Sequence, residues 1–233
     1  MLSRPQNCSD SVRATQIRIM EACRAAGRSV DSVTLLAVSK GQSTAAIDSA
    51  ACAGLQHFGE NFLQESLPKL EALSGRELTW HFIGRLQANK TRPVAERFAW
   101  VHGVDRLKIA ERLSAQRPLH ASPLNLCLQL QVGGEASKGG VAAADMAALA
   151  QAVRALPRIR LRGLMCMPPA ETSVSRQRHW FGETRQVFDN LNEHGHGLDT
   201  LSMGTSIDFE AAIAEGATLV RIGTAIFGPR DAG

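Results

Sequence analysis

The sequence predicts one α/β domain over residues 1–233, in which eight parallel strands close into a (β/α)8 TIM barrel with an extra N-terminal helix. Two observations lead to this class. Eight short apolar runs alternate with helical segments over about 200 residues, an order typical of parallel α/β folds. No long linker interrupts them, and 44% apolar residues suffice for one large core. A closed barrel accommodates eight such units better than an open doubly wound sheet does.

The first half of the chain is expected to hold one helix and then four strand–helix units. The opening helix lies between a capping Asp10 and Gly27, and its apolar face comprises Val12, Ile19, Met20, Cys23 and Ala26. Short apolar runs predict strands at 33–38, 56–58, 78–83 and 99–102. Helices are expected at 43–53, where Gly54 ends the helix, at 61–73, around Val94, Ala95 and Phe98, and at 105–116.

The second half repeats the pattern and contains the longest strand, at 124–132. Three further strands are expected at 159–165, 200–203 and 218–222. The helix after the fifth strand shares one face between Met146, Leu149, Ala150 and Val153. The next helix carries Trp180, Thr184, Val187, Phe188 and Leu191 at helical spacing and stops at Gly195, and a last one surrounds Ala211 and Ile213.

Composition narrows the classes of function. The formal charge of +4 is spread along the chain, so no basic run suits nucleic acid or a lipid surface. No apolar stretch approaches the roughly twenty residues that a bilayer span needs, and the N-terminus lacks a signal-peptide pattern. The cysteines are odd in number, widely spaced and without a C-x-x-C pair: Cys8, Cys23, Cys52, Cys127 and Cys166. We therefore expect a cytoplasmic protein without nucleic-acid or membrane partners and without a metal site.

One lysine stands where an imine-forming ligand needs an amine. Lys40 closes the first strand, whereas the segments 202–206 and 223–224 follow strands seven and eight. Because strands one and eight are neighbours in a closed barrel, the amine and these glycine- and hydroxyl-rich loops share one mouth. Glycine allows the backbone to approach a phosphate closely. The arrangement suits an aldehyde that carries a phosphate, such as pyridoxal 5′-phosphate.

Other interpretations of these residues stay open. Lys40 is also placed to form an ion pair with Glu60, and its pKa must fall from about 10.4 before the amine can act as a nucleophile. Arg221 lies inside an apolar strand and needs a partner, either a carboxylate or a ring nitrogen or phosphate of a ligand. Asn61 suits a helix cap as well as a ligand contact. His81 suits an interior position with a backbone partner.

Several sequence blocks in the same order resemble the pyridoxal phosphate homeostasis protein (YggS/PROSC) family. They cover nearly the whole chain and comprise residues 35–40, 58–61, 81–84, 86–87, 89–90, 161–165, 201–204 and 220–228. The fold that this resemblance implies is the barrel domain of bacterial alanine racemase without the second domain. The family's members are regarded as binders and distributors of vitamin B6 without an established catalytic reaction.

The resemblance also implies a set of cofactor-binding residues. Lys40 would form the covalent Schiff base, and Arg221 would face the pyridine nitrogen. The phosphate would be held by the loops that contain Ser202, Gly204, Thr205, Ser206, Gly223 and Thr224. Asn61, His81 and Met165 are expected near the cofactor. The chain departs from the usual family pattern at Gly41, Thr205 and Ile207, which affects the expected phosphate contacts more than the imine.

The interpretation that we favour is a carrier of pyridoxal 5′-phosphate that acts in vitamin B6 homeostasis without turnover, as a monomer, with apo-enzymes as recipients. A racemase of this fold type uses a tyrosine from another domain as its second base, but this sequence contains no tyrosine. Cys166 or His81 would have to replace it. A Schiff-base aldolase without a cofactor is the other alternative, although it leaves Arg221 without a task. Lys138 offers a second amine that would take up the aldehyde transiently.

Overall fold

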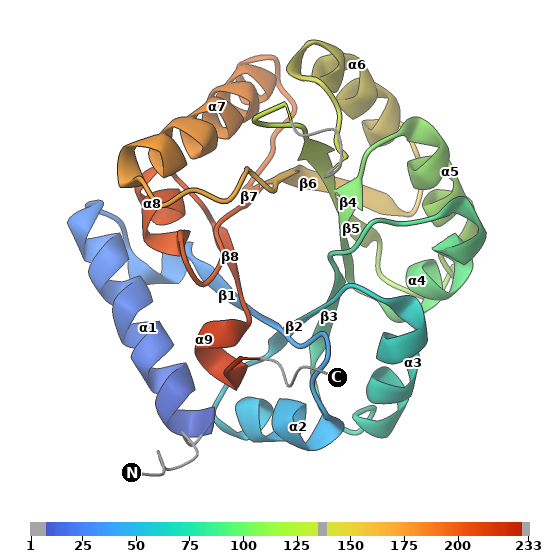
Figure 1. Ribbon diagram of the computed structural model, residues 1–233. Coiled ribbons are helices and arrows are strands. Elements are labelled where there is room, and N and C mark those ends of the chain that lie inside the picture. Colours follow the sequence, from blue (N-terminus) through green and yellow to red (C-terminus); the bar gives the residue numbers. More distant parts are fainter. Residues whose placement is uncertain (1–7, 135–138, 230–233) are drawn as a thin grey trace.

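The computed structural model describes residues 8–134 and 139–229. Within these residues eight parallel strands form a closed barrel in chain order, as Figure 1 shows from the face where the strands end. The strands are β1 (Thr34–Val38), β2 (His57–Glu60), β3 (Thr79–Phe82), β4 (Trp100–Val104), β5 (Leu124–Leu130), β6 (Ile159–Cys166), β7 (Thr200–Ser202) and β8 (Leu219–Ile222). The prediction of a (β/α)8 barrel is confirmed.

Helices surround the barrel and cover its outer side (Figure 1). They are α1 (Cys8–Ala25), α2 (Thr44–Cys52), α3 (Leu63–Ala72), α4 (Thr91–Arg97), α5 (Leu107–Gln116), α6 (Ala143–Arg154), α7 (Val174–Glu193), α8 (Phe209–Ala214) and α9 (Thr224–Phe227), with 3-10 turns η1 (Val30–Ser32) and η2 (Ala88–Lys90). The extra helix α1 packs against α8 and α9. Asp10 lies in the first turn of α1, so its predicted role as the cap is wrong.

Closure of the barrel brings the first and last strands together. Leu36 of β1 is in register with Arg221 of β8, and Ser202 of β7 is in register with Leu219 of β8. The loops that follow β7 and β8 therefore lie beside the end of β1, where Lys40 is placed. Since parallel strands all end on the same face, this juxtaposition follows from strand order alone.

The core fills the barrel and the layer between strands and helices with buried apolar side chains. Two strands approach closely at Gly163, because a Cβ atom there would lie 1.7 Å from the carbonyl oxygen of Thr200. β6 and β7 therefore need a residue without a side chain at this point. In the described part of the chain, no helix combines the length and hydrophobicity required to cross a membrane.

Candidate functional site

A cavity of about 250 Å³ opens at the mouth of the barrel, among the ends of β1, β2, β3, β6, β7 and β8. It is lined by Val38, Lys40, Asn61, Ile83, Met167, Thr205, Ser206, Ile207, Arg221, Gly223 and Thr224. Seven of these were expected from the sequence to bind a ligand: Lys40, Asn61, Thr205, Ser206, Arg221, Gly223 and Thr224. The cavity thus combines one amine, one guanidinium and several hydroxyl groups.

A buried ion pair fixes the end of β1 just before Lys40. The Lys69 amine on α3 donates to Oε1 of Glu60 at 2.9 Å and to the carbonyl oxygen of Ser39 at 2.9 Å. The hydroxyl of Ser39 donates to the same Glu60 oxygen at 2.6 Å. Glu60, which the sequence offers as a partner for Lys40, is therefore bound by Lys69. Sequence analysis missed Lys69, because nothing in its helix marks this lysine as buried.

The two carboxylates around this ion pair have pKa values shifted in opposite directions. Burial raises the pKa of Glu60, against the lowering effect of hydrogen bonds from Ser39 and Lys69. Burial also acts to raise the pKa of Glu65, but hydrogen bonds from Lys69 and from the Gly41 N–H outweigh it and lower the pKa. The charge of Lys40 contributes to this lowering. The lysine amine thus lies within electrostatic reach of an ionised carboxylate.

The turn after Lys40 depends on a glycine. Gly41 has φ of 73°, in the left-handed region that side chains rarely adopt. Its N–H donates to Oε1 of Glu65 on α3. A glycine at position 41 therefore suits the backbone conformation there.

The loop after β7 is held tightly against α8. Gly204 has φ of 92°, and a Cβ there would lie 2.7 Å from the Ala212 side chain and 2.9 Å from Phe209 Cα. The N–H and hydroxyl of Thr205 both donate to Oδ1 of Asp208, at 2.6 and 2.8 Å. Asp208 thereby supplies a carboxylate next to the exposed Ile207.

The loop after β8 approaches β1 closely. A Cβ on Gly223 would lie 3.2 Å from the carbonyl oxygen of Val38, the last residue of β1. Thr224 follows as the first residue of α9, and the N–H of Ala225 donates to the hydroxyl of Ser206 at 3.4 Å. The segments after β7 and β8 therefore form one continuous wall of the cavity. We call this wall, which comprises residues 205–206 and 223–224, the cradle.

Arg221 is buried, with 5% of its surface exposed, and its partners are neutral. Its Nη1 donates to the carbonyl oxygen and, at 2.8 Å, to the hydroxyl of Ser202, and its Nη2 donates to the carbonyl oxygen of Cys166 at 2.8 Å. Among the described residues no carboxylate forms an ion pair with it, so that alternative is not realised. A guanidinium has five N–H donors, and these three acceptors leave at least two for a ligand in the cavity.

Four residues that were expected to contact a ligand do not line the mouth cavity. Ser202 and Gly204 lie behind its wall, and Met165 is buried in β6, whereas Met167 lines the cavity. His81 is buried in the barrel and contacts other histidines rather than a backbone partner. Asn61 caps no helix, because Phe62 is the N-cap of α3. Lys138 lies outside the described residues, and the described part contains no cluster of metal-binding side chains.

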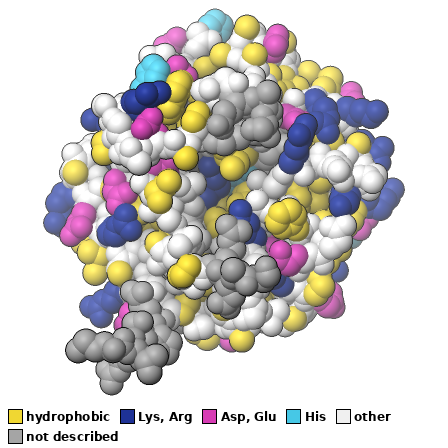
Figure 2. Space-filling model, viewed as in Figure 1, with side chains coloured by type: hydrophobic (Ala, Val, Ile, Leu, Met, Phe, Trp, Pro, Cys, Tyr) yellow, Lys and Arg dark blue, Asp and Glu magenta, His cyan; other side chains and the backbone are white. Residues whose placement is uncertain are grey.

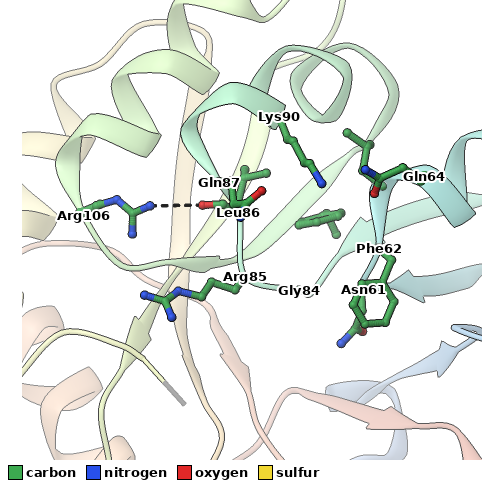
Figure 3. Close-up of a pocket in the computed structure, with 11 residues that line it drawn as sticks. Asn61, Phe62, Gln64, Gly84, Arg85, Leu86, Gln87, Lys90 and Arg106 are labelled. Carbon is green, nitrogen blue, oxygen red and sulfur yellow. Dashed lines mark hydrogen bonds between the residues drawn. The ribbon is translucent and has the colours of Figure 1, made fainter. Parts of the chain in front are cut away.

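A second cavity of about 470 Å³ adjoins the first and shares Asn61 with it (Figure 3). Its charged lining residues are all cations: Arg85, Lys90 and Arg106. Arg106 donates to the carbonyl oxygen of Leu86 at 3.4 Å, the bond drawn in Figure 3. Oδ1 of Asn61 is buried and has no hydrogen-bond partner within the described residues. A polar ligand group would satisfy it.

The same face of the molecule is basic. Figure 2 shows a hollow at its centre with Lys and Arg side chains inside, and further basic side chains on the side of α4 and α5. Such a field raises the local concentration of anions and guides them towards the cavities.

Comparison with known proteins agrees with the fold. The family model for the N-terminal domain of alanine racemase matches residues 17–231. A protein of Pseudomonas aeruginosa named pyridoxal phosphate homeostasis protein is 56% identical over 225 residues, 97% of this chain and 96% of that protein. A protein of the same name from Escherichia coli K12 is 48% identical over 217 residues, 92% of this chain and 93% of the other.

A solved structure is similar over nearly its whole length. PipY of Synechococcus elongatus PCC7942, with PLP bound, superposes with a TM-score of 0.80 at 37% identity. The similarity covers 90% of this chain and 100% of PipY.

Proposed function

The chain belongs to the pyridoxal phosphate homeostasis protein family, which has the alanine racemase N-terminal domain, and we propose that it binds pyridoxal 5′-phosphate through Lys40. One observation carries the proposal: the Lys40 amine, the buried Arg221 and the cradle line a single cavity at the barrel mouth. The name of the P. aeruginosa relative and the PLP bound to PipY support it. The function that follows is carriage of the cofactor within vitamin B6 homeostasis.

The residues present fit the cofactor. When bound, pyridoxal 5′-phosphate supplies an aldehyde that condenses with a lysine amine, a ring nitrogen and a phosphate. Lys40 provides the amine on a strand end that Ser39, Glu60 and Lys69 hold rigid. In the cradle, Ser206 and Gly223 combine a hydroxyl with a backbone that no side chain covers, which suits the phosphate.

Arg221 would donate to the ring nitrogen. A guanidinium stays protonated and can only donate hydrogen bonds. The ring nitrogen that accepts from Arg221 would therefore stay unprotonated. The ring is then a weak electron sink, and its capacity for carbanion chemistry is low. Arg221 in this position favours carriage of the cofactor over turnover.

The other lining residues also support a carrier rather than a racemase. The described lining of the mouth cavity includes no Asp, Glu, His, Cys or Tyr that could serve as a second base beside Lys40. Cys166 is buried behind Arg221, and burial raises its pKa to about 11. His81 lies away from the cavity, and burial followed by the charges of His102 and His57 lowers its pKa well below the ordinary value. Neither is placed as the second base.

The decisive experiment is the near-visible spectrum of purified protein before and after addition of pyridoxal 5′-phosphate. Wild type should be yellow, and borohydride reduction followed by peptide mass spectrometry should place the adduct on Lys40. Lys40→Ala should lose both signals, whereas Lys90→Ala, a lysine of the neighbouring cavity, should keep them. A colourless protein that stays colourless with added cofactor would contradict the proposal. Labelling only after addition of a phosphorylated sugar would indicate the aldolase instead.

Transfer to apo-enzymes in the cytoplasm is part of the same proposal. Three apolar side chains at the rim of the two cavities are exposed: Phe62 (60%), Met167 (42%) and Ile207 (68%). Exposed apolar groups around a cofactor site suit contact with a partner protein. Replacing Ile207 by Ser should leave cofactor binding intact and slow the activation of an apo-enzyme by loaded protein. Equal activation rates for both proteins would argue against docking at this rim.

A further inference from the structure

Three histidines cross the barrel interior in contact with one another. Nδ1 of His57 on β2 lies 3.0 Å from Nε2 of His81 on β3. Nδ1 of His81 lies 2.9 Å from Nε2 of His102 on β4. His81 and His102 are fully buried, and His57 is half-buried. Each contact joins neighbouring strands, so the rings form one path.

The path connects the two ends of the barrel. At its inner end, Nδ1 of His102 lies 2.8 Å from the hydroxyl of Ser202, to which Arg221 donates at 2.8 Å. At its outer end, His57 lines a cavity of about 260 Å³ at the base of the barrel, where the strands begin, and His81 also belongs to the lining of this cavity. Arg162 and Asp199 form an ion pair at 2.8 Å in the lining of that cavity. The mouth cavity is thus joined to the base through side chains alone.

The two hydrogen bonds of the Ser202 hydroxyl set the direction of every other hydrogen bond in this path. Its hydroxyl oxygen accepts from Arg221, and within the described residues the only acceptor for its proton is Nδ1 of His102. His102 is then protonated at Nε2 and donates to Nδ1 of His81. His81 is in turn protonated at Nε2 and donates to Nδ1 of His57. All three rings are neutral Nε2–H tautomers, and every donor points away from Arg221.

This orientation of the hydrogen bonds stabilises the buried charge of Arg221. Within the described residues no carboxylate forms an ion pair with the buried Arg221, an arrangement that costs free energy unless dipoles solvate the cation. The hydroxyl of Ser202 and the three rings direct their acceptor ends towards it, and hydrogen bonds aligned in series polarise one another. Among the residues that the structure describes, the guanidinium is thus stabilised without a paired carboxylate that would compete for its remaining donors.

We propose that His57, His81, His102 and Ser202 form a directed hydrogen-bond chain that positions Arg221 and stabilises its charge for the ligand in the mouth cavity. The chain members are positioning residues, because none of them lines that cavity. The chain carries no proton from the base to the mouth, since its donors point outwards and Arg221 keeps its protons. The effect of this hydrogen-bond chain on the ligand rests on the proposed function. The tautomers of its three histidines are a property of the protein without ligand.

The tautomers are measured directly by two-dimensional ¹H–¹⁵N NMR of protein labelled at histidine, without cofactor. His57, His81 and His102, assigned by single substitutions, should each show a protonated Nε2 and an unprotonated Nδ1, unchanged between pH 8 and pH 5.5. His120, exposed after α5, is the reference for a ring in solvent. A ring of the chain with Nδ1 protonated, or one that takes a second proton in this range, would overturn the proposal.

Two variants at the base then test the connection to Arg221. His57→Asn keeps an acceptor near the position of Nδ1, so the tautomers of His81 and His102 should stay as in wild type. His57→Phe removes the acceptor, so part of the His102 population should switch to Nδ1–H. In cofactor-loaded protein, His57→Phe should shift the pH profile of the visible band and His57→Asn should not. Identical tautomers in both variants would refute the chain, whereas a missing visible band would fault only cofactor binding.

Discussion

Replacing Lys69 by Met should destabilise the protein strongly, although the lysine lies outside the mouth cavity. The side chain of Glu60 has no exposed surface, and that of Lys69 is 7% exposed. Without the amine, Glu60 keeps only the hydrogen bond from Ser39, and its Oε2 already lacks a partner within the described residues. Removing one partner of a buried ion pair costs about 3–5 kcal/mol. We expect a loss of this size in the free energy of unfolding.

The loss should depend on pH in a defined direction. Burial already raises the pKa of Glu60 above its ordinary value of 4.5, and loss of Lys69 raises it further. A carboxyl group with a raised pKa in the folded state favours folding at low pH and loses this contribution as pH rises through that pKa. The difference between Lys69→Met and wild type should therefore shrink as pH falls from 7.5 towards 5.

Urea unfolding followed by circular dichroism measures both effects. Lys108→Met, at an exposed lysine on α5, is the matched control and should stay within about 0.5 kcal/mol of wild type. Glu60→Gln combined with Lys69→Met should recover part of the loss, because no buried charge is then left unpaired. A cost below about 1 kcal/mol for Lys69→Met, or a cost independent of pH, would refute this account of the ion pair.

Three further predictions concern the barrel wall and interior. Gly204→Ala should lower the free energy of unfolding by about 2–5 kcal/mol, because it adds overpacking against α8 to backbone strain. Gly54 has φ of 95° and open space around it, so Gly54→Ala should cost only about 1–2 kcal/mol. Equal losses for the two variants in thermal unfolding would contradict this. Iodoacetamide at pH 8 should label exposed Cys52 rapidly and buried Cys127, whose pKa burial raises to about 12, only after denaturation; mass spectrometry of native protein decides. Burial and then the charge of Arg221 lower the pKa of His102 to about 3. The unfolded chain therefore binds a proton that the folded protein does not, and the free energy of unfolding should fall by up to about 1.4 kcal/mol for each pH unit below pH 6.5. His102→Asn should lessen this slope.

Much of the fold followed from local patterns. Each strand was expected within a few residues of its observed bounds, because a buried parallel strand is a short apolar run and the next helix begins after a polar turn. The edges were less certain. β2 extends to Glu60, because that side chain is buried against Lys69. A single-sequence pattern treats a glutamate as a loop residue.

The sequence alone determined the barrel, the place of Lys40 and the loops opposite it, because strand order fixes which segments meet at one mouth. Tertiary structure decided how that mouth is held: the pairing of Glu60 with Lys69, the neutral partners of Arg221 and the histidines behind it. These contacts join residues up to 100 positions apart, as in the bond between His102 and Ser202. Their formation depends on strand register and side-chain direction, which no local periodicity encodes.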